Sequence, residues 1–455
     1  MSAFVPKTRV HIVGVGGAGM SGVARLLLEM GCVVSGSDAQ QSDVLHDLAV
    51  AGISVTVGAD ATHGQDAEII VWSPAVDLEH VELVAGRQRH ARMLTRAEAL
   101  AELSTLQPVL GITGTHGKTT ATSMLVHVLH AAHRDDSRLL GAPVLGVGPN
   151  GHWGNGALVL EVDESYGTFA LLSPHALGVL NVEPDHLDHY GTLDNLELAF
   201  VSLIERTTGV VVLWVDDAGV ARIRARLERD VVTVSEQDDA SWNVRDIEVS
   251  QRGSSFVLAN RDEQHELTLH VTGRHNVLNA AVVAVLALES GIAIEAVRSG
   301  LALFEGVPRR FDLRGSWRGV DVYEDYAHLP SEIAVTLAAA RSAGYQRITA
   351  VFQPHRVTRT LALASDFARA FQLADSVVIT DIYSAGEPNP TAITGMVVAE
   401  AVRTVQPSES VFYEPTFDDV ATSLDLLLEQ SDVIFLLGAG DVAGIIDHLP
   451  GGLDK

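Results

Sequence analysis

The stretch GITGTHGKTT, which ends at Thr120, combines glycine, lysine and threonine at a spacing suited to holding phosphate. It does not match the strict phosphate-loop pattern G-x-x-x-x-G-K-[ST], because isoleucine stands at the first glycine position. The required chemistry is nevertheless present, since Gly114 and Gly117 let backbone N–H groups face an anion and Lys118 supplies a cation. Thr119 adds a hydroxyl of the kind that ligates Mg²⁺. We predict a phosphate-binding loop here rather than an ordinary glycine-rich turn.

Lysine is rare in this chain and occurs only at Lys7, Lys118 and Lys455. The single lysine away from the two ends of the chain therefore lies in the predicted phosphate loop. This placement favours a functional role for Lys118 over that of a solvated surface charge.

Carboxylate and imidazole side chains follow two apolar runs downstream of this loop. EVDESYGTF comes after ALVL, and NVEPDHLDHYG comes after HALGVL. Parallel strands end at one shared edge of a sheet, so both stretches should face the phosphate loop, where such side chains can ligate Mg²⁺ beside a triphosphate. A solvated acidic turn is the alternative for either stretch alone. The side chains concerned are Glu161, Asp163, Glu164, Glu183, Asp185, His186, Asp188 and His189.

A second glycine-rich stretch, GVGGAGMSG, follows the first apolar run of the chain. It matches G-x-G-x-x-G at Gly14, Gly16 and Gly19, and Asp38 lies nineteen residues after the last of these glycines. In dinucleotide-binding folds such a loop holds a diphosphate at a helix N-terminus, and the acidic residue binds a ribose hydroxyl. A nicotinamide dinucleotide and a UDP-sugar both carry a diphosphate, and a purely structural tight turn is the third interpretation.

Further polar and cationic side chains gather toward the C-terminal end. Two asparagines of HNVLNA, three residues apart, share one face of a predicted helix, where amides can bind a purine edge. GVPRRF follows, and DYAHLP and FQPHRVTRT each end a predicted strand. In an acidic protein this concentration of arginine and histidine favours binding of a carboxylate or phosphate, against the alternative of caps and surface ion pairs. The side chains concerned are Asn276, Asn279, Arg309, Arg310, Asp325, Tyr326, His328, His355, Arg356 and Arg359.

These motifs lie on apolar runs that alternate with helical patterns along three successive parts of the chain, which predicts α/β structure with parallel sheets. The middle part adds a β-rich portion at about residues 231–271, where SSFVLA and HELTLHV have the pattern of antiparallel strands. We expect three domains at residues 1–105, 106–312 and 313–455, with small-molecule sites in the clefts between them.

The composition of the whole chain restricts its function. Its 455 residues include 31 Lys and Arg against 58 Asp and Glu, a formal charge of −27, which argues against nucleic-acid and anionic-membrane partners. Cys32 is the single cysteine, which fits a reducing compartment. The N-terminus has no signal-peptide pattern, and no run of about 18 apolar residues occurs. We expect a cytoplasmic protein without membrane insertion.

As an ordered set the motifs resemble the Mur ligases. The series runs from GVGGAGMSG through GTHGKTT, EVDES, NVEPDHLDHYG, HNVLNA, RRF, DYAH and FQPHRVTRT to GAGD, about residues 11–441. GTHGKTT and FQPHR-x-x-RT are the most specific of them. The resemblance implies a Rossmann-like N-terminal domain that binds a UDP-sugar, and a central P-loop ATPase-type α/β domain with added β strands. It also implies a Rossmann-like C-terminal α/β domain that binds the amino acid and closes over the site.

The resemblance further implies a reaction. Within the family the motifs are most similar to the branch that adds L-alanine to UDP-N-acetylmuramate in peptidoglycan precursor synthesis. There the γ-phosphoryl group of ATP, supported by Mg²⁺, passes to the lactyl carboxylate, and the amine of L-alanine displaces phosphate from the acyl phosphate. This order agrees with the chemistry, because a carboxylate is a poor acyl donor until it is phosphorylated and two polyanions need cations to approach one another.

Roles for individual residues follow from the resemblance as well. The implied ATP-binding residues are Gly114, Thr115, His116, Gly117, Lys118, Thr119, Thr120, Asn276, Asn279, Arg310, Asp325 and His328. The implied UDP-sugar-binding residues are Gly14, Gly16, Gly17, Ala18, Gly19, Asp38 and Ser73. The implied metal ligands are Thr119, Glu164 and His186, and the amino acid would meet Tyr326, His355, Arg356 and Arg359. The implied catalytic residues are Lys118, His186, His355, Arg356 and Arg359.

The absence of lysine between Lys118 and Lys455 bears on the branch of the family. Later ligases of the pathway use a carbamylated lysine in the central domain, which this chain cannot supply. This favours the alanine-adding branch or the related ligase that attaches a recycled tripeptide to the same nucleotide. An NAD-dependent oxidoreductase is the third hypothesis, but it leaves Lys118 and Thr119 without a role.

The chain departs from the usual family residues at three positions. Val162, Tyr166 and Leu329 stand where alanine, aspartate and a second histidine are usual. The last two replace polar groups close to the implied site. The sequence leaves open the oligomeric state, monomer or dimer, and the preference among L-alanine, glycine and L-serine.

Overall fold

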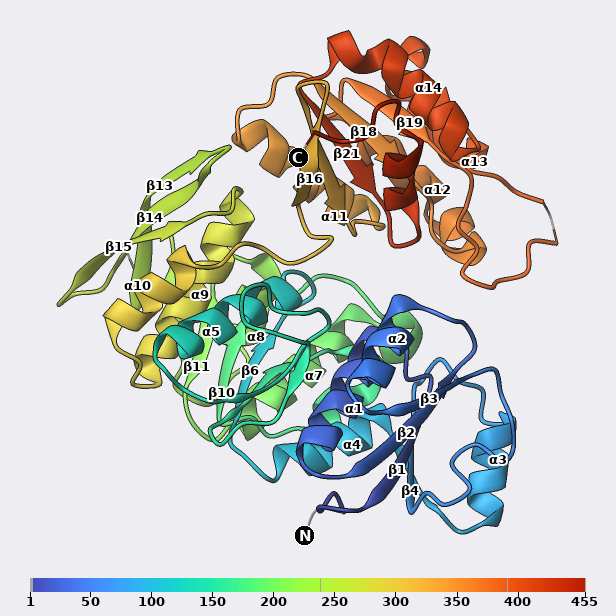
Figure 1. Ribbon diagram of the computed structural model, residues 1–455. Helices are drawn as coiled ribbons and strands as arrows, with labels where there is room; N and C mark the ends of the chain where they lie inside the picture. The colour runs from blue at the N-terminus through green and yellow to red at the C-terminus, as the bar shows by residue number, and fades with distance from the viewer. Residues whose placement is uncertain (1–2, 238, 391, 455) are drawn as a thin grey trace. The chain divides into compact units, whose positions relative to one another are not determined.

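The computed structural model describes residues 3–237, 239–390 and 392–454, apart from the side chains of Tyr166, Asp188 and Gln430. It contains three α/β domains, each with its own sheet, which confirms the predicted fold class (Figure 1). The first two domains form one compact unit that ends at residue 305, and the third, from residue 306, forms a second unit together with the short stretches 249–254 and 271–274. Within the described ranges, no helix has both the length and the apolar character needed to cross a membrane.

The N-terminal domain is a five-stranded parallel sheet with helices on both faces. Its strand order, 3-2-1-4-5, is that of a Rossmann-like fold, and the order reverses between the first and fourth strands. Side chains alternate between the two faces, so Ile12 packs with three of the helices and Val13 with the remaining one. The strands are β1 (Arg9–Val13), β2 (Val33–Asp38), β3 (Ser54–Val57), β4 (Ile69–Trp72) and β5 (Arg92–Thr95). The helices are α1 (Ala18–Glu29), α2 (Asp43–Val50), α3 (Val81–Gln88) and α4 (Arg96–Ser104), of which α3 alone covers the Val13 face.

The central domain is built on a ten-stranded sheet in the order 15-14-13-12-11-10-6-9-7-8, and the expected extra strands are present. The strands are β6 (Val109–Thr113), β7 (Ser137–Leu139), β8 (Gly151–His152), β9 (Leu158–Glu161), β10 (Ala176–Val179), β11 (Val211–Trp214), β12 (Val232–Ser235), β13 (Trp242–Ser250), β14 (Gly253–Ala259) and β15 (Gln264–Leu269). The helices are α5 (Lys118–Ala131), η1 (Ser165–Leu171), α6 (Leu187–Tyr190), α7 (Leu193–Arg206), α8 (Ala218–Arg224), α9 (Arg274–Glu289) and α10 (Ile294–Ala302). Strands β6, β9 and β10 are parallel neighbours, so the three segments that follow them leave the sheet at one edge.

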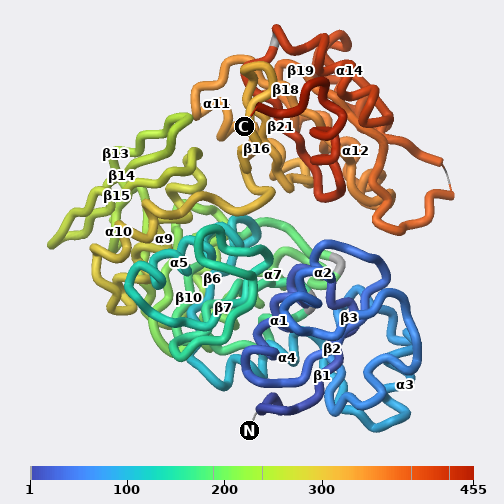
Figure 2. The backbone as a smooth tube through the Cα atoms, viewed as in Figure 1, coloured from blue at the N-terminus to red at the C-terminus, as the bar shows by residue number. Residues whose placement is uncertain are grey.

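The N-terminal and central domains share one hydrophobic core. Leu26 and Leu27 of α1 belong to the same cluster as Leu139 of β7 and Leu158 of β9. Helix α1 packs against β7 and β8 (Figure 2). The approach is so close that a Cβ atom on Gly151 would lie 2.1 Å from the carbonyl oxygen of Gly22 in α1. Only glycine fits at this crossing.

The C-terminal domain has a six-stranded sheet in the order 16-17-21-18-19-20, parallel except for its first pair. The strands are β16 (Asp312–Trp317), β17 (Val320–Asp325), β18 (Ile348–Phe352), β19 (Ser376–Ile379), β20 (Val411–Tyr413) and β21 (Val433–Leu437). The helices are α11 (Pro330–Ser342), α12 (Val357–Ala370), α13 (Met396–Arg403), η2 (Ser408–Ser410), α14 (Phe417–Leu427), η3 (Leu428–Gln430) and η4 (Val442–His448). Alternate residues of β21 pack with α11, α12 and α13 on one face and with α14 and η4 on the other.

Candidate active site

The predicted phosphate loop joins β6 to the N-terminus of α5. Gly117 has a left-handed φ of 81°, after which α5 begins at Lys118. A Cβ atom on Gly117 would lie 2.8 Å from Oδ1 of Asn279, so the α9 amide sits directly against the loop. Asn276 lies one turn earlier on α9 and is equally buried. Thr119 and Thr120 follow in the first turn of α5, where backbone N–H groups point out of the helix end and favour an anion.

Asn181, which sequence reasoning passed over, holds this loop in shape. Its Oδ1 accepts a hydrogen bond from the His116 backbone N–H at 2.7 Å, and its Nδ2 donates to the His116 carbonyl at 3.0 Å. The Thr115 hydroxyl accepts from the backbone N–H of Glu183 at 2.9 Å. The one available signal was position, since Asn181 is the first polar residue after β10.

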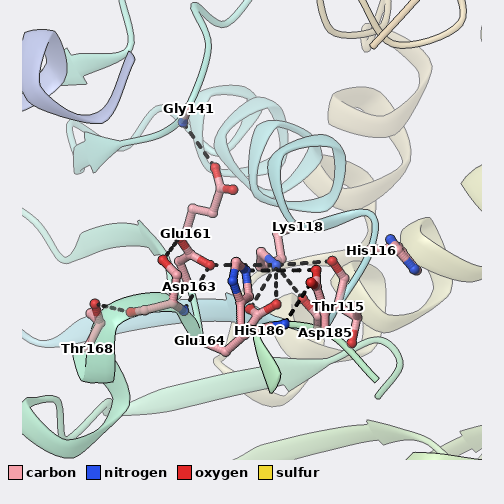
Figure 3. Close-up of polar contacts among 12 residues, drawn as sticks. Thr115, His116, Lys118, Gly141, Glu161, Asp163, Glu164, Thr168, Asp185 and His186 are labelled. Atoms are coloured by element: carbon pink, nitrogen blue, oxygen red, sulfur yellow. Dashed lines mark hydrogen bonds and ion pairs between the residues drawn. The ribbon is translucent and has the colours of Figure 1, made fainter. Parts of the chain in front are cut away.

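Lys118 folds back over its own loop (Figure 3). Its Nζ donates to the carbonyl oxygens of Gly114 and Thr115 at 2.7 and 3.1 Å and lies 2.8 Å from Oε2 of Glu164. Burial works against the charge, but the carboxylates of Glu164 and Asp163 outweigh it and raise the pKa of Lys118. The loop therefore contains a fully charged ammonium group.

Asp163, Glu164 and His186 form a group that could hold a cation. One ligand atom from each lies within 4.8 Å of the others. Burial raises the pKa of Glu164 to about 7, although Lys118 works to lower it. Glu164 is 1% exposed and ends up beside His186 because β9 and β10 are both neighbours of β6. The carboxylate oxygens of Asp163 and Glu164 suit Mg²⁺, a hard cation that prefers oxygen ligands.

Thr119 contacts a different carboxylate. Its hydroxyl donates to Oε1 and Oε2 of Glu161 at 3.0 and 3.1 Å. The Gly141 backbone N–H donates to the same carboxylate at 3.0 Å, as Figure 3 shows. The three expected metal ligands therefore do not lie together in this structure. Glu164 and His186 lie with Asp163, whereas Thr119 lies with Glu161. Both groups have the oxygen ligands that Mg²⁺ prefers.

The glycine loop of the N-terminal domain joins β1 to α1. Gly14 has a left-handed φ of 78°, and a Cβ atom there would lie 3.1 Å from Cβ of Ser73, so Ser73 borders the loop. The Gly16 backbone N–H donates to Oδ2 of Asp38 at 2.9 Å. Gly17 caps α1, which starts at Ala18. The predicted diphosphate-binding residues therefore lie together at the point where the strand order reverses.

Arg96, at the start of α4, is a second residue that the sequence did not single out. A Cβ atom on Gly19 would lie 2.6 Å from the Arg96 guanidinium carbon, so the cation lies against the N-terminal glycine loop. Its Nε is buried without a hydrogen-bond partner among the described residues. Although burial acts the other way, the charges of Lys118 and Arg96 lower the pKa of Asp163. Arg96 thus lies against the N-terminal glycine loop, and its charge acts on Asp163, which lies beside Lys118.

In the C-terminal unit, the predicted residues gather where β17 and β18 end. Asp325 accepts backbone hydrogen bonds from Phe311 and Ala327, and burial raises its pKa. The Arg310 guanidinium lies over the Tyr326 ring at 4.9 Å.

His328 and His355 lie beside one another with ring centroids 6.0 Å apart. Burial, reinforced by His328 and Arg359, lowers the pKa of His355 to about 4. Burial also lowers the pKa of His328. Both imidazoles are therefore neutral at pH 7, and the positive charge here comes from the arginines.

The two arginines of FQPHRVTRT differ in their contacts. Arg359 lies 3.3 Å from Nδ1 of His355, whereas Arg356 donates from Nε to Glu387 at 2.6 Å. Tyr383 stacks on His355 with ring centroids 5.6 Å apart. Glu387 and Tyr383 come from the loop after β19, and no sequence motif pointed to them.

Comparison with known proteins agrees with this arrangement of sites. Residues 9–107, 153–287 and 309–440 match the profiles described as Mur ligase family, catalytic domain; Mur ligase middle domain; and Mur ligase, glutamate ligase domain. The chain is 40% identical to the UDP-N-acetylmuramate–L-alanine ligase of Myxococcus xanthus, over 96% of this chain and 94% of that protein. The chain belongs to the Mur ligase family.

Two further proteins are similar to this Mur ligase over nearly their whole length. The UDP-N-acetylmuramate–L-alanine ligase of Kineococcus radiotolerans is 42% identical, with 96% of this chain and 94% of that protein covered. The crystal structure of the UDP-N-acetylmuramate–alanine ligase of Thermotoga maritima superposes with a TM-score of 0.82 at 28% identity, covering 96% of this chain and 97% of that one.

This Mur ligase differs from the usual family residues at Val162, Tyr166 and Leu329, and these positions have different surroundings in the structure. Val162 is a core side chain, and a Cβ atom on Gly111 of β6 would lie 2.8 Å from it. Leu329 directly precedes α11, and its backbone N–H donates to Glu332 at 3.1 Å. The side chains of Tyr166 and Asp188 lie outside the described residues.

Proposed function

We propose that this Mur ligase is a cytoplasmic enzyme that joins L-alanine to the lactyl carboxylate of UDP-N-acetylmuramate in peptidoglycan precursor synthesis. Membership of the family implies use of ATP. The similarity over the whole chain to proteins that carry this name supports the substrates. The observation that carries the proposal is the contact of Lys118 with Glu164, beside Asp163 and His186, at the end of a phosphate loop.

The loop residues act on the phosphate groups of ATP. Backbone N–H groups at the N-terminus of α5 receive phosphate oxygens, and Gly117 lets the loop turn toward them. In this structure Nζ of Lys118 donates to two carbonyl oxygens and to Glu164. Its positive charge stabilises the γ-phosphoryl group as this group leaves ATP. Thr119 with Glu161, and Glu164 with His186, are the residues that would hold Mg²⁺, which would supply positive charge beside the phosphates and the accepting carboxylate.

The two other substrates use the remaining clusters. The loop from Gly14 to Gly19, with Asp38 and Ser73, receives the UDP group, whose diphosphate suits the N-terminus of α1. The C-terminal unit contributes three residues to the binding of ATP, namely Arg310, Asp325 and His328. The same unit binds the amino acid and the acyl phosphate through Tyr326, His355, Arg356 and Arg359, with the neutral His355 as a hydrogen-bond acceptor.

Phosphate release measured with purified protein, ATP, Mg²⁺ and UDP-N-acetylmuramate tests the proposal. L-alanine, glycine, L-serine and the tripeptide are offered separately, and mass spectrometry identifies the product. We expect release that depends on L-alanine and a product larger by one alanyl residue. Release with the tripeptide alone would move the enzyme to the recycling branch, and no amino-acid-dependent release at all would refute the ligase assignment.

A further inference from the structure

Arg138, in β7 of the central domain, is a buried arginine without a carboxylate partner. It is 8% exposed. Within residues 3–237, 239–390 and 392–454, its only hydrogen bond runs from Nε to the carbonyl oxygen of Pro149, at 3.0 Å. Burial lowers the pKa of Arg138, opposed by the more distant charges of Glu29 and Asp135. The donors on Nη1 and Nη2 of Arg138 have no partner among the described residues and are open to an anion.

A cavity of about 330 Å³ lies in front of this guanidinium. Its apolar wall consists of Val126 and Leu129 from α5, Val159 from β9, and Val147 from the loop before β8. The volume is within the range of small-molecule sites. The cavity therefore combines four aliphatic side chains with a set of charged and polar ones that includes Arg138.

Four of the other titratable side chains that line the cavity already have partners, and the fifth, His130, is exposed on α5. Arg134 donates to both carboxylate oxygens of Asp136, at 2.8 and 2.7 Å. His152 lies 2.8 Å from Glu29 and 3.0 Å from Asp135. Two described arginines line the cavity. Arg134 is paired, so Arg138 is the one whose donors remain available.

We propose that this cavity binds a small aliphatic carboxylate, with the carboxylate on Arg138 and the hydrocarbon part against the four apolar side chains. A guanidinium pairs with a carboxylate through two parallel hydrogen bonds. Asp135 and Asp136 line the same cavity and would repel the second charge of a phosphate dianion, so a monoanion is favoured.

The site is separate from the phosphate loop. The cavity lies at the C-terminal end of α5, and Lys118 is at the N-terminal end, so about 15 Å of helix lies between them. Arg138 also bonds the carbonyl of Pro149, and the next residue, Asn150, donates from Nδ2 to the Ala18 carbonyl at 2.8 Å in the first turn of α1. An occupant that fixes Arg138 is expected to stabilise this contact between the two domains.

Ligand-observed NMR with hexanoate tests the proposal on the full-length protein. We expect saturable binding with a Kd of about 1 mM, and binding at least about tenfold weaker for hexanamide, which has the same size without the charge. Inorganic phosphate should not compete with hexanoate. The substitution Arg138→Leu should weaken binding at least about tenfold, whereas Arg206→Leu, which removes an arginine that donates to the Leu172 carbonyl outside the cavity, should not.

A second variant keeps the test decisive if Arg138→Leu does not fold, as judged by circular dichroism. Val147→Phe leaves Arg138 in place and fills the cavity from a half-buried loop position, so it should also weaken hexanoate binding. Three results would each overturn the proposal: hexanamide binding as tightly as hexanoate, displacement of hexanoate by phosphate, or wild-type affinity in a folded variant. No saturable binding of hexanoate up to about 50 mM would overturn it as well.

Discussion

Thr119 donates its hydroxyl hydrogen to the carboxylate of Glu161, whereas the adjacent Lys118 pairs with Glu164. Neighbouring residues of one loop therefore contact different carboxylates of the stretch EVDES. The division follows from β9, because Glu161 is the last residue of the strand, whereas Glu164 lies three residues later, directly before η1. Glu161 and Glu164 should accordingly have separable functions.

Glu161→Gln tests this separation. The amide keeps the size of the side chain and can still accept from Thr119, but it removes the negative charge that a Mg²⁺ ion there requires. We expect the Mg²⁺ concentration for half-maximal phosphate release to rise about 10- to 100-fold. The matched control is Glu205→Gln, on the exposed surface of α7, which should leave the Mg²⁺ dependence unchanged. A Mg²⁺ dependence equal to that of the unsubstituted protein would show that Glu161 has no part in metal binding.

Lys118→Ala should abolish turnover without removing the sugar-nucleotide site. The substitution takes away the cation that faces the γ-phosphoryl group, so we expect phosphate release to fall at least about 10³-fold. Glu164 loses its ion-pair partner and, being buried, should become protonated at neutral pH. Calorimetry should still detect UDP-N-acetylmuramate, because the N-terminal glycine loop is unchanged. A folded variant that has lost this binding as well would contradict the proposed assignment of the two loops.

Arg96→Leu should lower substrate affinity while leaving stability intact. The Arg96 guanidinium lies against Gly19, so its positive charge would act on a diphosphate bound at the N-terminal glycine loop. Removal of a charged hydrogen bond is expected to weaken UDP-N-acetylmuramate binding by about 1.5–3 kcal/mol in calorimetry. Thermal unfolding should show no loss, because a partly buried unpaired charge contributes little to folding. The control is Arg92→Leu on the surface, and a drop in melting temperature without loss of affinity would make Arg96 a structural residue.

Glu82 should make stability depend on pH below 5. It is buried on the α3 face of the N-terminal sheet and, although burial acts to raise it, hydrogen bonds from His11, Ser37 and His63 lower its pKa from 4.5 to about 2. A pKa lower in the folded state gives stability that is present above the unfolded pKa and lost as pH falls through 4.5 toward 2. From this group alone, we expect the free energy of unfolding to fall by about 1 kcal/mol between pH 5 and 3.5.

Urea unfolding of Glu82→Gln at the same two pH values checks this expectation. The variant should be less stable at pH 5, because a neutral amide replaces the carboxylate that pairs with two histidines, and its stability should change less with pH. An equal pH dependence in both proteins would assign the acid sensitivity to other groups.

The alternation of apolar runs and helical patterns was enough to predict three α/β domains. It also placed the phosphate loop, EVDES and NVEPDHLDHYG at one edge of a sheet, since parallel strands carry their following segments there. Sequence spacing could not decide which carboxylate of EVDES faces Thr119, because that depends on where β9 ends. Arg96 and Asn181 gave no signal of their own, since their contacts join segments 77 and 65 residues apart. Such contacts are properties of the folded chain.

The contact of Gly22 with Gly151 bears on how the protein is made. Helix α1 completes its packing only against β7 and β8, and its leucines share a core with Leu139 and Leu158. On the ribosome, helix α1 therefore emerges with part of its apolar surface uncovered until about 50 residues beyond the N-terminal domain have been synthesised. A gene fragment that stops near residue 105 would encode a protein with that surface permanently exposed, whereas one that continues to residue 305 would encode the complete first unit.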